Sequence, residues 1–139
     1  MCIVLDASRF GKFQKPADEN MKPVRDWVYR GYGKIAYANT EDVKREWDKE
    51  APKVRTQLQR RAKLKLVPTN AVRIKQAELE GKTKSNDAHI IALAIVAEVK
   101  LLVSDDNDLC CDFSNPDLVG GEVYRTKDDK NKLTEVFCP

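Results

Sequence analysis

The carboxylates that could do chemistry stand at the two ends of the most apolar stretch of the chain, SNDAHIIALAIVAEVKLLVSDDND (residues 85–108). Asp87 precedes its apolar middle, and three acids follow it: Asp105, Asp106 and Asp108. A further aspartate, Asp6, ends the apolar run CIVLD. Carboxylates held close together repel one another unless a cation lies between them, and an all-oxygen ligand set favours Mg²⁺ or Mn²⁺ over Zn²⁺. These acids indicate a divalent-metal site.

A carboxylate-held Mg²⁺ suits the hydrolysis of a phosphodiester, because the ion can activate water, orient the phosphate and stabilise the leaving oxygen. Plainer explanations exist: Asp87 as a first-turn acid favoured by the helix dipole, and SDDND as a solvated turn. A calcium loop in DDNDLCCDF is a third explanation, but the segment lacks the central glycine and closing glutamate of an EF-hand. The joint placement of the acids favours the catalytic interpretation.

Short apolar runs predict the strands that position these acids, and helical spacing predicts the helices. The expected strands are CIVLD (2–6), KIAY (34–37), KLLVS (100–104) and a late edge strand, GGEVYRT (120–126). The expected helices are a segment ending at Gly31 and Gly33, 41–50 capped by Asn39 or Thr40, 54–66 with Val54, Leu58, Ala62 and Leu64 inward, 71–81, an apolar helix capped by Ser85, and a helical turn at 108–113. Strands alternating with helices predict a single α/β domain over residues 1–139, with a mostly parallel central sheet.

In such sheets ligands bind beyond the carboxyl ends of the strands. Asp6 follows the first strand, and the acids at 105–108 follow the strand KLLVS. Asp87 stands at the start of the helix that leads into that strand. We therefore expect all these acids at one edge of the sheet.

Three pieces of the sequence, IVLDAS, SNDAHIIALAI and LLVSDDNDL, resemble the PIN-domain family of Mg²⁺/Mn²⁺-dependent ribonucleases, particularly the small VapC-type toxins. The resemblance covers the whole chain in order and spacing. Its more specific part is the D-x-x-I-x-A-x-A helix, followed by an apolar strand and Ser-x-Asp. The resemblance implies a three-layer fold with about four to five strands flanked by helices, and acids gathered at the strand ends.

The resemblance also implies roles for individual residues. Asp6 matches the first family acid, Asp87 the acid that opens the helix, and Asp106 the acid of the Ser-x-Asp step, which leaves Asp105 as a bystander. Asp108 matches an additional acid, so the implied metal ligands are Asp6, Asp87, Asp106 and Asp108. The supporting residues it implies are Ser8 and Ser104.

The remaining catalytic acid belongs to the helix at 41–50, where Glu46, Glu41 and Asp42 are alternatives and we favour Glu46. A surface ion pair within that helix would explain Glu46 equally well. His89 is the lone histidine, and a packing or supporting role is favoured over that of a general base. Glu98, where many family members have glycine, implies a differently shaped turn.

RNA needs positive charge around an acidic pocket, and an acid-free basic run supplies it. The expected RNA-binding residues are Lys53, Arg55, Arg60, Arg61 and Lys63. A solvated helix face explains this run equally well, and three tyrosines that could stack on bases are better explained by packing. The formal net charge of +3 identifies no nucleic-acid binder by itself.

The four cysteines, Cys2, Cys110, Cys111 and Cys138, lack CxxC spacing, and the sequence has no basic leader or long apolar span. We expect reduced thiols in a soluble, cytoplasmic protein without a membrane segment. The expected function is a metal-dependent endoribonuclease acting as a toxin, with an antitoxin partner and a homodimeric state. The alternatives are a PIN-fold nuclease for RNA processing or DNA cleavage, and an inactive nucleic-acid-binding module.

Overall fold

The computed structural model describes residues 1–136 and 138, and its centre is a sheet of five parallel strands. The strands lie in the order β3-β2-β1-β4-β5. Their bounds are β1 (Cys2–Leu5), β2 (Lys34–Tyr37), β3 (Leu64–Leu66), β4 (Leu101–Val103) and β5 (Glu122–Tyr124). Every pairing is parallel, with Val4 opposite Leu102 and Ile35 opposite Leu64. The expected α/β class is confirmed, and all five strands end at one edge.

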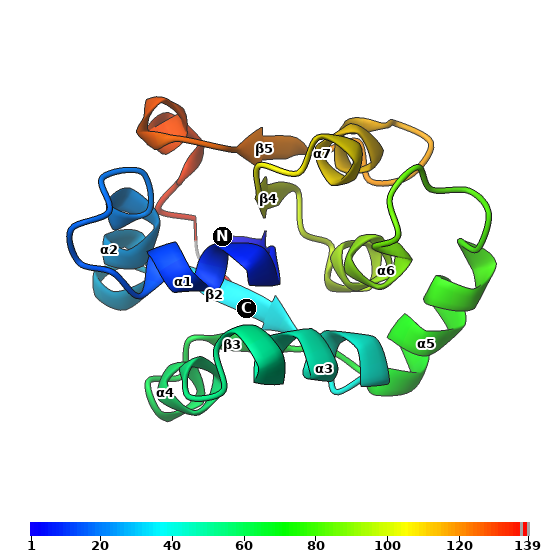
Figure 1. The fold of residues 1–139 in the computed structure, drawn as a ribbon, viewed down its shortest axis with the longest axis horizontal. Helices are drawn as coiled ribbons and strands as arrows, with labels where there is room; N and C mark the ends of the chain where they lie inside the picture. Colours follow the sequence, from blue (N-terminus) through cyan, green and yellow to red (C-terminus); the bar gives the residue numbers. More distant parts are fainter. Residues whose placement is uncertain (137, 139) are drawn as a thin grey trace.

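Helices flank this sheet. They are α1 (Phe10–Phe13), α2 (Lys22–Arg30), α3 (Glu41–Glu50), α4 (Val54–Arg60), α5 (Thr69–Glu78), α6 (Ala88–Ala97) and α7 (Asn107–Ser114), with 3₁₀ turns η1 (Ala7–Arg9) and η2 (Lys127–Lys132). Figure 1 shows α1 and α2, in blue, on one side of the sheet and α5 and α6, in green, on the other. This arrangement agrees with the expected layers of helices around a sheet.

The hydrophobic core lies on both faces of the sheet, with α6 on one side and Phe10, Phe13, Val24 and Val28 of α1 and α2 on the other. Strand residues such as Ile3, Leu101 and Leu102 are fully buried. Every residue of α6 from His89 to Ala94 is buried, so this helix packs on more than one side. Its apolar sequence therefore reflects burial within the domain. Within the described residues, the structure contains no helix of the length and apolarity that crossing a membrane requires.

The prediction of one helix over 54–66 is wrong in its second half. Helix α4 ends at Arg60, Ala62 takes the left-handed conformation (φ 56°), and Leu64–Leu66 forms β3. A left-handed residue cannot continue a right-handed helix, so the chain turns there into the sheet. Val54 and Leu58 are buried as expected, but Ala62 is exposed and Leu64 belongs to the strand. The alternation in KLKL was the strand signal.

Glu98 closes α6 in the left-handed conformation (φ 57°, ψ 41°), which glycine adopts most readily. The turn thus keeps the shape that a glycine would give it, contrary to the different shape expected from the sequence. A left-handed non-glycine residue costs about 1–2 kcal/mol, whereas glycine loses about 0.5–1 kcal/mol of chain entropy.

We therefore expect Glu98→Gly to raise the free energy of unfolding by about 0.5–1 kcal/mol. Urea denaturation measures this change. Glu98→Ala removes the same carboxylate but keeps the strained conformation, so it should bring no such gain. A gain of equal size in both variants would show that the carboxylate, and not the backbone, is responsible.

Cys2 and Cys138 form a disulfide, so the expectation of reduced thiols is wrong for this pair. Cys2 begins β1 and Cys138 lies near the other end of the chain, and their Cα atoms are 5.2 Å apart. Trp27 of α2 also binds the segment before Cys138, because its Nε1 donates a hydrogen bond of 2.7 Å to the carbonyl of Thr134. Cysteine spacing could not reveal the pair, since only the folded chain brings its ends together. Cys110 is a buried free thiol and Cys111 an exposed one.

Reduction of this disulfide, or Cys2→Ser, should lower the free energy of unfolding by about 2–5 kcal/mol, because the bridge closes a long loop in the unfolded chain. Thermal unfolding with and without dithiothreitol measures the effect. Cys111→Ser is the control and should change stability little. If reductant leaves the unfolding temperature of the wild-type protein unchanged, the pair does not stabilise the fold.

Candidate metal centre

Asp6 and Asp106 meet at the centre of the sheet edge. Asp6 follows β1 and Asp106 follows β4, and these strands are neighbours. From β1 the chain continues to β2 and β3 on one side, whereas β4 and β5 lie on the other. The boundary between β1 and β4 is thus the point where the strand order reverses, and ligands in open α/β sheets bind there.

The Ser104 hydroxyl links these two acids. Its Oγ donates a hydrogen bond of 2.7 Å to Asp6 Oδ2 and accepts one of 3.1 Å from the Asp106 backbone nitrogen. The other Asp6 oxygen accepts from the backbone nitrogen of Ser8 (3.2 Å). Ser8 therefore supports Asp6 through its main chain, and its side chain is exposed. Asp106 also caps α7, accepting from Leu109 N at 2.9 Å.

Asp87 is positioned at the start of α6 by the loop that contains Ser85, and the role of Ser85 differs from the one expected from the sequence. The N-cap of α6 is Asp87 itself, not Ser85 as expected. The Ser85 hydroxyl instead accepts a hydrogen bond from the Asp87 backbone nitrogen (3.3 Å) and donates one to Asp112 (2.8 Å). Ser85 thus joins Asp87 to α7 rather than capping α6 with its side chain.

Asp112 is a structural residue of the site that the sequence did not reveal. It is buried, and its oxygens accept three hydrogen bonds, from Lys84 N, Ser85 N and Ser85 Oγ, all within 2.9 Å. A buried carboxylate is stable only with such partners. Its place in the apolar segment DLCCDF was the only signal available. Asp112 fixes the loop that precedes Asp87 against α7, the helix that Asp106 caps.

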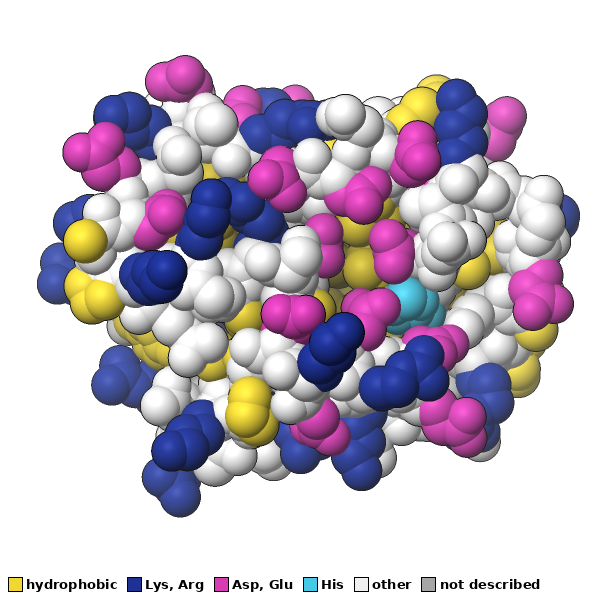
Figure 2. All heavy atoms as spheres, viewed as in Figure 1, with side chains coloured by type: hydrophobic (Ala, Val, Ile, Leu, Met, Phe, Trp, Pro, Cys, Tyr) yellow, Lys and Arg dark blue, Asp and Glu magenta, His cyan; other side chains and the backbone are white. Residues whose placement is uncertain are grey.

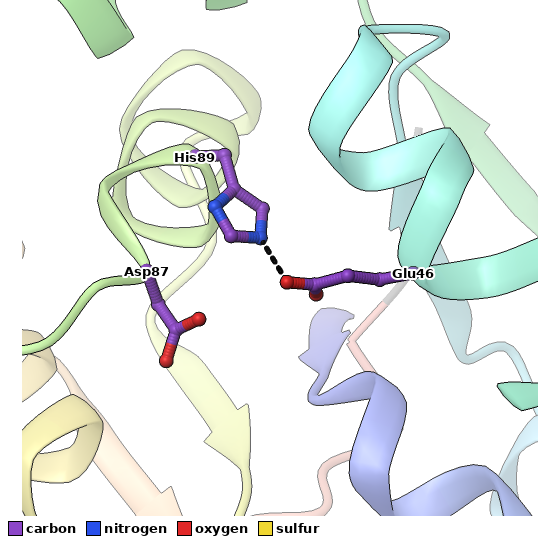
Figure 3. A group of neighbouring side chains, drawn as sticks. All are labelled: Glu46, Asp87 and His89. Carbon is purple, nitrogen blue, oxygen red and sulfur yellow. Dashed lines mark ion pairs between the residues drawn. The ribbon is translucent and has the colours of Figure 1, made fainter. Parts of the chain in front are cut away.

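Glu46 reaches the same place from α3. Its Oε1 lies 2.8 Å from His89 Nε2, an ion pair when the imidazole is protonated. Figure 3 shows Glu46 and His89 pointing toward each other from α3 and α6, with Asp87 beside them. One ligand atom from each of Glu46, Asp87 and His89 can be chosen so that all lie within 4.8 Å of one another. These three residues are spaced to share one metal ion.

The charges of Asp6 and Asp106 act on the carboxyl group of Asp87. The pKa of Asp87 is raised to about 6, mainly because the carboxyl is partly buried; the negative charges of Glu46, Asp6 and Asp106 also raise it, whereas His89 lowers it. Burial lowers the pKa of His89, but Glu46, Asp87 and Asp42 outweigh burial and raise the pKa overall. Burial and neighbouring negative charge both disfavour the ionised form of Asp87, and a divalent cation would relieve this cost.

The other acids considered from the sequence lie outside this cluster. Asp105 is paired with the buried Arg9 at 2.9 Å, which suits a bystander. Asp108 is exposed in the first turn of α7 and, unlike Asp106, is not among the charges that raise the pKa of Asp87. Asp42 pairs with Arg45 and accepts from Gln76, and Glu41 is exposed. The geometry favours Glu46 as the acid of α3.

The basic residues between Lys53 and Lys63 lie in different surroundings in the folded protein. Arg55 donates a hydrogen bond of 2.9 Å to the Tyr37 hydroxyl, and Lys63 donates one of 2.8 Å to the carbonyl of Gly31. Lys53 is exposed just before α4. Arg60 and Arg61 line a groove on another face of α4, described below. The run is therefore not one continuous basic face.

Acidic side chains gather around the histidine on one face of the molecule, and Lys and Arg side chains border them (Figure 2). The carboxylates there offer oxygen donors, which suit Mg²⁺ or Mn²⁺, whereas an imidazole ligand such as His89 would also suit Zn²⁺ or Fe²⁺. Comparison with known protein families, with curated proteins and with solved structures finds no match. The function is therefore inferred from the residues of the chain and their geometry.

Proposed function

We propose that the protein is an Mg²⁺- or Mn²⁺-dependent endoribonuclease of the PIN type. The observation that carries the proposal is the convergence of four carboxylates from four separate segments of the chain. Asp6 follows β1, Glu46 projects from α3, Asp87 opens α6, and Asp106 follows β4. The order of the matching motifs in the sequence supports the same proposal.

The bound cation would polarise the scissile phosphate and lower the pKa of an attacking water. Asp6, Asp87, Asp106 and Glu46 are the residues that would hold it. Ser104 and Asp112 limit the motion of the first three, through the hydrogen bonds to Asp6, to the Asp106 backbone and to the loop before Asp87. His89 orients Glu46 by the contact at 2.8 Å. Such fixed geometry lowers the reorganisation needed for reaction.

Cleavage of an unstructured, fluorophore-labelled RNA tests the proposal. Purified protein with Mn²⁺ or Mg²⁺ should produce internal cuts, and EDTA should stop them. A matched DNA strand in the same assay distinguishes a ribonuclease from a DNA-cleaving nuclease. If RNA stays intact with either metal while isothermal calorimetry with Mn²⁺ detects no binding, the metal-nuclease proposal is wrong.

The toxin role is the finer part of the proposal, with an antitoxin and a second copy of the chain as partners. Induced expression of this chain alone should arrest bacterial growth, and the catalytically inactive variant described in the Discussion should not. Normal growth with active enzyme in the lysate would favour a nuclease of RNA processing instead. Size-exclusion chromatography with light scattering tests the expected dimer.

A further inference from the structure

A groove of about 720 Å³ lies between α2 and α4, beside the end of α1. Its lining is rich in arginine and contains two aromatic rings. The lining residues are Phe13, Gln14, Arg25, Asp26, Tyr29, Arg30, Gln57, Arg60 and Arg61. It contains none of the acids of the candidate metal centre, so it is a separate feature of the surface.

The charge of the groove is positive. Four arginines and one aspartate line it, and that aspartate, Asp26, already pairs with Lys22 at 2.7 Å. Arg25 donates to the carbonyls of Phe13, Lys15 and Pro16, which are neutral acceptors, and its charge acts on Asp26 only as a lesser influence beside Lys22. Between described residues, no ion pair engages Arg30, Arg60 or Arg61. Such a concave basic surface attracts phosphate.

The groove also offers a flat stacking surface. The Arg61 guanidinium lies over the Tyr29 ring, 4.8 Å from its centroid, and Phe13 contacts the same ring at 5.9 Å. Burial raises the pKa of Tyr29, so its hydroxyl is neutral at physiological pH. Arg61 is exposed, so a ligand in the groove can reach its side chain. Unpaired bases stack on aromatic rings and on arginine planes of this kind.

The groove is joined to the metal centre by a short, rigid path. η1 and α1 lead directly from Asp6 to Phe13, seven residues later, which is roughly 10 Å at the helical rise. Phe10 packs on Phe13 and on Trp47, the residue after Glu46, with ring centroids 6.4 Å and 4.6 Å apart. The end of the groove at Phe13 therefore belongs to the same short segment of chain as Asp6.

We propose that this groove binds the single-stranded RNA next to the scissile bond, with one base on the Arg61–Tyr29 stack and phosphates on Arg30 and Arg60. The proposal rests on the proposed function, and it adds where the substrate lies beyond the metal centre. The exposed Arg61 over the Tyr29 ring favours a nucleic acid over an acidic peptide, because a peptide would use the charge but not the stack.

Fluorescence anisotropy with a fluorescein-labelled, unstructured 12-nucleotide RNA tests this site without cleavage. All measurements use the Asp106→Asn background in EDTA. The double variant Arg60→Ala/Arg61→Ala should bind about tenfold more weakly, with a shallower dependence of affinity on salt. The matched control, Lys82→Ala/Lys130→Ala, removes the same charge from exposed positions elsewhere and should bind within about twofold of the parent. Equal losses in the two double variants would overturn the proposal.

Stacking is tested separately by Arg61→Lys, which keeps the charge but removes the plane. We expect severalfold weaker binding to the RNA and no difference from the parent on an otherwise identical strand of abasic residues. Parent-like affinity of Arg61→Lys for the RNA would contradict the stack. Loss of binding in the groove variants without any cleavage by wild type would contradict the nuclease proposal alone. Cleavage by wild type with unaffected binding in the groove variants would contradict only the groove.

Discussion

Asp106→Asn should reduce metal-dependent RNA cleavage by about a thousandfold, comparable to the loss of a group that stabilises transition-state charge. The substitution removes one negative charge from the centre, but asparagine is as good an N-cap as aspartate, so the bond to Leu109 N and the start of α7 should survive. The loss should appear in kcat and not in the unfolding temperature. Single-turnover cleavage with saturating Mn²⁺ measures it.

The adjacent Asp105→Asn is the matched control. It removes the same charge one residue away and breaks the pair with Arg9, but Asp105 lies outside the acid cluster. We expect cleavage within about threefold of wild type, the size of a distant charge effect at moderate salt. Comparable losses in both variants would mean that the general negative charge of this edge matters, rather than a specific ligand.

Asp87→Asn should stabilise the metal-free protein at neutral pH while removing its response to metal. The pKa of Asp87 is raised from 3.8 to about 6, so the folded state binds a proton more readily than the unfolded state. The contribution of Asp87 to the free energy of unfolding is therefore most favourable below pH 4, and it becomes less favourable as pH rises to about 6. The full shift corresponds to about 3 kcal/mol, which solvent screening reduces to about 1–2 kcal/mol.

The variant is neutral at every pH and avoids this loss. We expect it to unfold at higher denaturant concentration than wild type at pH 7, with the difference vanishing near pH 4. Mn²⁺ at a hundred times its Kd should stabilise wild type by about 2.7 kcal/mol and the variant far less. Asp117→Asn, at an exposed position remote from the cluster, is the control. A variant less stable than wild type at pH 7 would show that Asp87 does not carry the electrostatic cost.

Deprotonation of His89 also lowers the free energy of unfolding as pH rises, but it does so at higher pH than deprotonation of Asp87. Its pKa is raised overall, so the protonated imidazole stabilises the fold below pH 6.5, and this stabilisation is lost as pH rises through the folded-state pKa. A wild-type protein without metal should therefore lose stability from weakly acidic to weakly alkaline pH. The Asp87→Asn variant should keep the part of this slope that belongs to His89.

The sequence alone was enough for the fold class and for most of the elements. Apolar β-branched runs marked β1, β2 and β4, and the pattern of α3 predicted its bounds of 41 and 50. The placement of acids after strands also predicted that Asp6 and Asp106 would meet, since parallel strands end at a common edge. These features are local, or follow from a rule that depends only on strand direction.

What the sequence missed depends on contacts between distant segments. β3 is three residues long and partly exposed, so its pattern was too weak to oppose the helical one before it. The Asp112 bonds to residues 84 and 85, the Glu46–His89 pair and the Cys2–Cys138 disulfide join positions 27 or more residues apart. No periodicity encodes such pairings, because each depends on how the packed helices are rotated and on where the chain ends lie.

The Ser104 hydroxyl gives the centre an unusual tolerance to change. Ser104 lies 98 positions after Asp6 in the sequence, but the two residues directly follow neighbouring strands. The register of these strands is fixed by Val4 opposite Leu102. The separation of the two acids is therefore set by backbone pairing in the sheet and not by the length of any loop. Insertions at the exposed turn around residues 81 and 82, in the segment that leads to Asp87, could change what surrounds the centre while its two central carboxylates stay where they are. New substrate preferences could arise there without rebuilding the chemistry.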